Sequence, residues 1–226
     1  MSHPDLTIPE SVLLLALNDE TGERKGNYLS YALAGAALTE LILQGRLAEV
    51  GDPPKKLAVV GDKPVGEPHL DACLEAIVAK GSGKNARAYI EAIGVKPSLS
   101  HPLFERLVGR GILSETRSKV LLFFTHTTYP EANPAPEAVL KERLLKAITG
   151  IGPVDVRDGA IIALAHHVDV LKYNFDRDLL KSRKDRIKAI AEGGLLPPTA
   201  TKAAIEGMQS AVMIATLVPI IVVATN

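Results

Sequence analysis

Two segments of the sequence are apolar on almost every side, and they limit the fold more than any other feature. Ile161–Ala165 forms the centre of a predicted helix over Arg157–Asn174, and Ala211–Ala224 dominates a second predicted helix over Ala204–Ala224. A helix that is apolar all round needs either a protein core or a lipid bilayer around it. Ala211–Ala224 is shorter than the roughly 20 residues that span a bilayer, and Pro219 interrupts it. We therefore favour two core helices packed against each other, with a tail anchor as the alternative.

The remaining pattern predicts a mainly α fold, in which one domain over residues 1–226 is a helical bundle surrounded by amphipathic helices. Thr7, Pro9 and Glu10 form a helix start with a capping box, which leads into a buried helix over Val12–Leu17. A polar, flexible loop is expected over Asn18–Asn27. Further helices are expected over Tyr28–Gln44, Leu70–Lys80, Ala86–Ile93, Pro102–Arg110, Pro136–Thr149 and Asp178–Glu192.

Two short β-hairpins interrupt the predicted helices. The first pairs Arg46–Val50 with Lys56–Val60. The second pairs Ile112–Glu115 with Lys119–Phe124 through a turn at Thr116–Ser118, and a loop over Thr125–Pro130 follows. Its consecutive apolar residues, Leu121–Phe124, are unusual for a half-exposed strand. They indicate a homo-oligomer contact or a membrane-facing tip at Ile112–Phe124.

Composition excludes several classes of protein. The 226 residues carry 26 basic and 26 acidic side chains, so the whole-chain charge that marks nucleic-acid binders is absent and we expect no nucleic-acid partner. The single cysteine, Cys73, excludes an internal disulfide and a thiolate metal cluster. The opening residues Met1–Leu6 lack the features of a signal peptide. These observations predict a cytoplasmic protein that is soluble or peripheral on a membrane.

Four features of the sequence suggest catalytic or metal chemistry, and a structural role is favoured over the chemical one for each. Gly81–Lys84 resembles a phosphate loop, but Val78 and Asn85 stand where that motif needs glycine and a hydroxyl residue, so a linker is favoured. His166 and His167 point about 100° apart on a helix, which disfavours a shared metal and favours a core role for His166. Neither His126 nor Cys73 has an identifiable catalytic partner, and Cys73 fits a core position. We expect no enzyme activity, cofactor or metal.

A basic segment over Arg177–Lys188 offers another kind of site. Six cations lie there, and a solvated helix face is the favoured explanation. The alternative is contact with anionic lipid, to which Arg24 and Lys25 in the preceding loop would add.

Several motifs together resemble the Golgi phosphoprotein 3 family, because they occur in the family's order over nearly the whole chain. The resemblance implies a helical domain with a projecting β-hairpin that takes part in self-association. Eukaryotic members are peripheral Golgi proteins that bind phosphatidylinositol 4-phosphate and retain glycosyltransferases. The matching segments are Leu6–Leu17 with Asp19–Gly22, Ala34–Leu47, Leu107–Leu113, Thr127–Pro130 and Leu164–Leu171.

The residues that bind the head group in this family do not carry over. The resemblance places the family's tryptophan and three arginines at Lys25, Ala34, Pro97 and Ser100. Without bidentate guanidinium groups a phosphate site loses affinity and selectivity. The basic N-terminal extension of eukaryotic members is also missing, so we expect a compact prokaryotic relative with a changed site.

The sequence therefore predicts a non-enzymatic peripheral membrane or adaptor protein. Its partner would be an anionic membrane surface or phospholipid head group, bound through Arg24, Lys25, Arg106 and Arg110. The alternative is a soluble protein-interaction scaffold that does not bind lipid.

Overall fold

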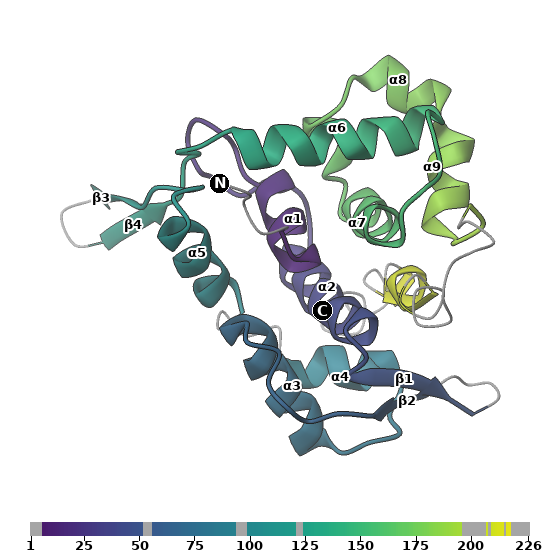
Figure 1. Ribbon diagram of the computed structural model, residues 1–226. Helices are drawn as coiled ribbons and strands as arrows, with labels where there is room; N and C mark the ends of the chain where they lie inside the picture. Colours follow the sequence, from purple (N-terminus) through teal and green to yellow (C-terminus); the bar gives the residue numbers. More distant parts are fainter. Residues whose placement is uncertain are drawn as a thin grey trace.

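The computed structural model describes residues 6–51, 56–93, 99–120, 124–195, 207, 209–214 and 216–217. The fold is mainly α, as predicted, with two small antiparallel hairpins (Figure 1). The hairpins pair β1 (Leu47–Val50) with β2 (Lys56–Val59) and β3 (Thr116–Val120) with β4 (Phe124–Thr128). The helices are α1 (Ile8–Leu15), α2 (Leu29–Leu43), α3 (Pro68–Lys80), α4 (Ala86–Ile93), α5 (Ser100–Gly109), α6 (Ala135–Thr149), α7 (Val156–His167), the 3₁₀ turn η1 (Leu171–Tyr173), α8 (Arg177–Ser182) and α9 (Lys184–Ala191).

The first helix, α1, lies at the centre of the molecule. Its predicted capping box is confirmed, because the Thr7 side chain accepts from the Glu10 amide while the Glu10 carboxylate accepts from Thr7. All eight residues of α1 are buried, and the helix contacts α2, α5, α6 and α7. A helix of only two turns is marginal in water by itself. Its stability therefore comes from burial among these four neighbours.

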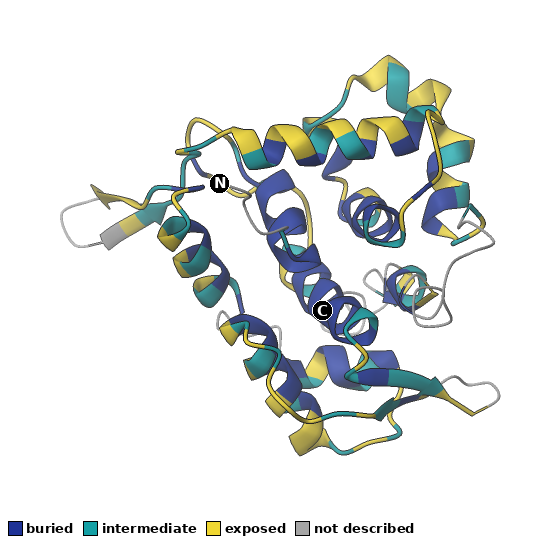
Figure 2. Cartoon of the chain, in the orientation of Figure 1, coloured by how far each residue is buried: buried dark blue, intermediate teal, exposed yellow. Residues whose placement is uncertain are grey.

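The other elements surround this centre in two groups. In Figure 1, α6, α8 and α9 lie on the side of α7, whereas α3, α4 and the β1–β2 hairpin lie at the far end of α2. Figure 2 shows burial along all of α1 and most of α2, and exposure on the outer sides of α3, α6 and α8. Gly45, at φ +69°, ends α2 because its amide and that of Arg46 bond back to the last turn. The β3–β4 hairpin projects from the body near α5.

The second hairpin lies further along the chain than the sequence predicts. Thr116–Ser118, predicted as the turn, belongs to β3, and Thr125–Thr128, predicted as a loop, belongs to β4. Thr116 pairs with Thr128 and Val120 with Phe124, so residues 121–123 connect the strands and lie outside the described residues. Of the apolar run Leu121–Phe124, Phe124 is the first residue of β4, and the structure does not describe the other three. Self-association through this hairpin stays a prediction.

Two predicted helices differ from the observed ones, since one ends early and the other is divided. The helix predicted over Arg157–Asn174 stops at His167, because Asp169 adopts a left-handed φ of +61° and the Val170 amide bonds to Ala165. This is the Schellman arrangement, with aspartate in the place usually held by glycine. The helix predicted over Asp178–Glu192 divides into α8 and α9 at Arg183, whose φ is −107° and ψ 11°.

The described part of the C-terminal segment is helical and packs on α2. Ala211 and Ile214 are fully buried. A Cβ built on Gly35 of α2 would lie 2.1 Å from Ile214 Cγ2, so the absence of a side chain at Gly35 lets the two helices approach. Gly207 similarly approaches Leu43. Most of Ala204–Ala224 lies outside the described residues, and its packing against Arg157–Asn174 stays a prediction.

Candidate functional site

The loop that carries Arg24 and Lys25 is held in a defined conformation, although its composition predicts flexibility. Asn18 organises the loop, since its side chain accepts the amides of Glu20 and Thr21 and its own amide donates to Glu23, at 2.8–3.0 Å. Gly22, at φ +66°, approaches the backbone of Tyr129 so closely that a Cβ would lie 2.2 Å from the Tyr129 carbonyl carbon. The loop is thereby fixed against the segment that follows β4.

Arg24 is exposed and lies on an aromatic stack. Its guanidinium carbon is 5.3 Å from the centroid of the Phe104 ring in α5. Phe104 in turn stacks on Tyr129, with ring centroids 3.9 Å apart and an interplanar angle of 10°. A guanidinium above an aromatic face gains a cation–π attraction and keeps its N–H donors available at the edge. Arg24 is thus oriented and remains accessible to an anion.

A small cavity adjoins Arg24 between the start of α2 and the start of α5. It is lined by Arg24, Leu29, Ser30, Leu33, Leu99 and Ser100. Its volume is about 10 Å³, which is room for about one water molecule. A cavity of this volume is too small to enclose a phospholipid head group. An anion at Arg24 would therefore bind at the surface.

Lys25 lies beside an exposed aromatic residue, Tyr173. Its ammonium is 5.8 Å from the ring centroid of Tyr173, and the ammonium of Lys172 is 5.1 Å from the same ring. The Lys25 amide donates to the Ala16 carbonyl at 2.6 Å, which ties the loop to the end of α1. Lys172 and Tyr173 do not belong to the site predicted from the sequence, because only the folded chain brings them beside Lys25.

Arg106 and Arg110, the other two predicted lipid ligands, face an interior carboxylate. Arg106 Nε and Arg110 Nη1 both donate to Glu10 Oε1, at 2.8 and 3.0 Å. Arg106 also pairs with Glu67, at 2.6 Å. The Glu10 side chain is fully buried, whereas those of Arg106 and Arg110 are 25% and 14% exposed. Two cations thus face two carboxylates. Arg106 and Arg110 therefore stabilise the fold, whereas Arg24 and Lys25 remain candidates for binding a ligand.

The charge state of Glu10 agrees with this structural role. Burial alone would raise the pKa of its carboxyl, but hydrogen bonds from Thr7 and the charges of Arg110 and Arg106 outweigh burial and lower the pKa. Glu10 therefore stays ionised, and removing either arginine would leave a buried charge poorly compensated.

Of the four positions that match the family's head-group residues, the three that the structure describes do not form a polar pocket. Ala34 is fully buried on α2, so its side chain is not available to a ligand. Ser100 lines the small cavity beside Arg24, Lys25 lies against Tyr173, and Pro97 lies outside the described residues. Arg24, one position before Lys25, lines the same small cavity as Ser100 and supplies a guanidinium there.

The structural context of each motif with suspected chemistry decides what role it has. Gly81–Lys84 is a linker between α3 and α4, as predicted, and it bonds to Leu57 of β2. Cys73 is buried, which raises the pKa of its thiol to about 12 and makes it unreactive. The core role predicted for His166 is wrong, because the residue is exposed at the end of α7. Among the described residues, no three His, Cys, Asp or Glu side chains group as metal ligands.

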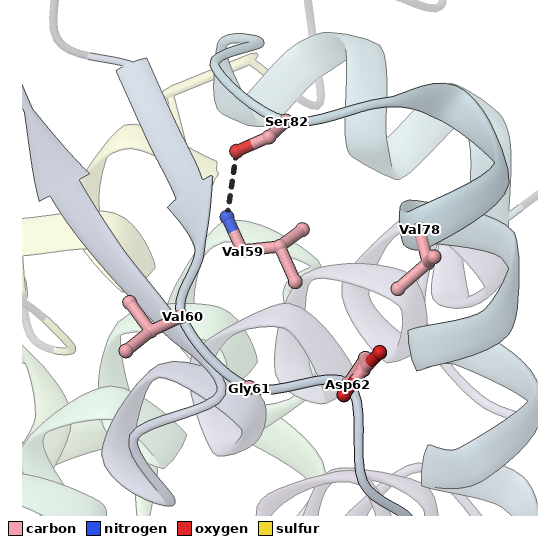
Figure 3. A pocket seen from close by; sticks show the side chains of 6 residues that line it. All are labelled: Val59, Val60, Gly61, Asp62, Val78 and Ser82. Atoms are coloured by element: carbon pink, nitrogen blue, oxygen red, sulfur yellow. Dashed lines mark hydrogen bonds between the residues drawn. The ribbon is translucent and has the colours of Figure 1, made fainter.

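An open pocket at the β1–β2 hairpin is a second candidate site (Figure 3). It has a volume of about 340 Å³ and is lined by Val59, Val60, Gly61, Asp62, Val78 and Ser82. The Val59 amide donates to Ser82 Oγ at 3.0 Å, which closes one side. Val60 and Val78 are exposed. Of the lining residues that the structure describes, only Asp62 is ionisable, so the pocket offers contact area rather than acid–base chemistry.

A third pocket, of about 270 Å³, lies where α7 begins, and its charges are paired within the protein. Arg143 donates to Asp158 at 2.8 Å, and Arg157 donates to Glu40. Asp155 accepts the amides of Arg157 and Asp158 as the cap of α7. These pairs hold α6, α7 and α2 together and leave little net charge to attract a ligand.

None of the helices in the described part of the chain is long and apolar enough to cross a membrane.

Comparison with known proteins identifies relatives in fungi. Vacuolar protein sorting-associated protein 74 of Eremothecium gossypii is 28% identical over 205 residues, which cover 75% of this chain and 61% of that protein. Its namesake in Schizosaccharomyces pombe is 26% identical over 167 residues, which cover 65% of this chain and 49% of that protein. This chain thus spans between about half and three fifths of the length of these two curated relatives. The family model of Golgi phosphoprotein 3 (GPP34) matches residues 8–208, and the chain belongs to this family.

Proposed function

We propose that this protein is a non-enzymatic, Golgi-type adaptor that docks on anionic phospholipid at the membrane surface. Membership of the Golgi phosphoprotein 3 family and the relatives named for vacuolar protein sorting support the adaptor role. The observation that carries the lipid proposal is the exposed Arg24 guanidinium, held over Phe104 in a fixed loop next to Lys25.

The mode of binding follows from the small volume beside Arg24. A pocket that recognises one head group needs several convergent donors, whereas diffuse attraction needs only cations near the surface. With one guanidinium at a cavity of about 10 Å³, we expect surface attraction. Binding should be weak, sensitive to salt, and little different for phosphatidylinositol 4-phosphate and other anionic lipids of matched charge.

Vesicle sedimentation at two salt concentrations tests this proposal. Arg24→Ala and Lys25→Ala should each weaken binding by about fivefold at low salt. Lys80→Ala, which removes an exposed cation from the end of α3, is the matched control and should have little effect. Tight binding that survives high salt and requires phosphatidylinositol 4-phosphate would contradict surface attraction.

A soluble scaffold without lipid binding is the second candidate. The exposed Val60 and Val78 at the pocket of Figure 3 favour it, since apolar side chains at an open pocket suit protein contact. Val78→Asp should then abolish binding of a protein partner while vesicle binding stays unchanged. Absence of vesicle binding at low salt, with intact folding, would favour this candidate over the adaptor on lipid.

A further inference from the structure

Two exposed tyrosines lie on neighbouring backbone segments at the end of α7. Tyr28 precedes α2 and is 48% exposed, and Tyr173 ends η1 and is 47% exposed. The Asn27 amide donates to the Val168 carbonyl at 3.1 Å and Gly26 packs against Val170, so residues 24–28 lie against residues 168–173. The two tyrosines thus belong to one surface.

Tyr28 occupies a conformation that its side chain disfavours. Its φ is +58°, and among the described residues Asp169 is the one other non-glycine residue with positive φ. Asparagine or glycine fits the left-handed region better than an aromatic residue. Tyr28 gives α2 no side-chain cap, and half of its surface is exposed. Neither packing nor capping explains a strained tyrosine here. The strain indicates that Tyr28 contacts a partner other than its own chain.

The charges of this surface are mainly positive. The two segments contain three cations, Arg24, Lys25 and Lys172, and one carboxylate, Asp169, which pairs with Lys172. Lys25 and Lys172 both lie over the Tyr173 ring. Tyrosine has an apolar ring and a polar hydroxyl, and it is enriched where a bilayer meets water, while lysine and arginine are attracted to anionic head groups. This combination of residues suits an anionic membrane.

We propose that Tyr28 and Tyr173, with Lys25 and Lys172, form an aromatic–basic surface that enters the head-group layer of an anionic bilayer. The inference rests on the proposed lipid docking and adds to it the part of the protein that is immersed. Arg24 and Lys25 supply attraction to the membrane, and the two tyrosine rings supply apolar contact that salt does not screen.

Single tryptophans provide a direct test, because the chain contains no tryptophan. Tyr28→Trp and Tyr173→Trp place a reporter on the surface. Val60→Trp is the control, since the Val60 amide bonds to Arg46 at the opposite end of α2, about 20 Å from Tyr28 along 15 residues of helix. With phosphatidylserine-containing vesicles, the emission at positions 28 and 173 should shift to the blue, and that at position 60 should not.

Tyr28→Asn separates docking from folding. Asparagine relieves the left-handed conformation, so the melting temperature should stay equal or rise, while vesicle affinity should fall by about fivefold or more. Lys172→Ala should lower affinity by about fivefold. Unchanged affinity of Tyr28→Asn would overturn the inference.

The outcomes distinguish this inference from the function on which it rests. Vesicle sedimentation without an emission shift at either position would overturn the immersed surface and leave lipid docking intact. Absence of sedimentation for the wild type at low salt would overturn both. A shift produced by a single-stranded oligonucleotide, and not by vesicles, would assign the surface to nucleic acid and overturn the proposal.

Discussion

Arg157 at the start of α7 and Glu40 near the end of α2 form a bidentate ion pair across the centre of the molecule. Its two hydrogen bonds are 2.7 and 2.6 Å long. Glu40 Oε2 also accepts the amide of Ile8, the first residue of α1, at 2.9 Å. One carboxylate thereby joins three helices. Burial alone would raise the pKa of Glu40, but Arg157 and the Ile8 amide outweigh it and lower the pKa.

Glu40→Gln should lower the free energy of unfolding by about 2–4 kcal/mol, because a neutral amide leaves Arg157 without its bidentate partner. Urea unfolding at neutral pH measures this change. The matched control is Arg87→Ala, which breaks an exposed pair with Glu91 on α4 and should cost about 0.3–0.5 kcal/mol. Equal effects of the two substitutions would show that the central pair contributes no more than a surface pair.

Glu137 should make the protein less stable as the pH rises. Burial raises its pKa to about 7, with Asp19 and Glu131 adding to the rise and Lys141 opposing it. Because the folded protein holds this proton more tightly than the unfolded chain, stability is lost as the pH rises from about 4.5 to 7. Glu137→Gln should remove this loss. The free energy of unfolding of the variant, relative to that of wild type, should therefore rise by on the order of 2 kcal/mol from pH 5 to pH 8. Urea unfolding at both pH values measures the difference, and a constant difference would contradict a raised pKa.

Gly22→Ala should displace the loop that carries Arg24. The new Cβ would clash with the Tyr129 backbone in addition to the strain of a positive φ, so we expect a loss of at least about 2 kcal/mol. Gly51→Ala controls for φ alone, since its φ is +85° and no atom lies within 4 Å of its Cβ position. It should cost about 1 kcal/mol. Thermal unfolding and vesicle binding should both separate the two variants, and equal melting temperatures would rule out the close contact.

Gly35→Ala should destabilise the packing of the C-terminal helix on α2 by about 1–3 kcal/mol, because the added Cβ meets Ile214. Gly109→Ala, in open space at the end of α5, should be neutral or stabilising by helix propensity. If the clash is the cause, Ile214→Ala should partly rescue Gly35→Ala in a double-mutant cycle. Additive effects would place the contact elsewhere.

Local signals predict much of the fold. The capping box of Thr7 and Glu10 marks the start of α1, and Gly45 marks the end of α2. The sequence does not predict the position of the second hairpin, because residues 116–119 are exposed and polar and β3 therefore shows no alternation of apolar residues. The sequence does not predict the end of α7 either, because Asp169, and not a glycine, adopts the left-handed conformation there.

The candidate site depends on contacts between distant residues, which the sequence does not reveal. Arg106 and Arg110 resemble surface cations in sequence, and their partner Glu10 lies 96 and 100 positions away. Arg24 and Lys25 lie in a polar loop, so the sequence alone predicts that they are accessible. Tyr173 and Phe104, the rings that orient them, give no local signal of that role.

The central position of α1 has a consequence for synthesis of the chain on the ribosome. The helix is made first, yet Arg157, which completes its surroundings through Glu40, follows about 150 residues later. At about 5–20 residues per second, roughly 7–30 s pass before that partner exists. Throughout this interval an apolar helix has no complete binding site in its own chain. Nascent chains should therefore depend on a holding chaperone until α7 has emerged.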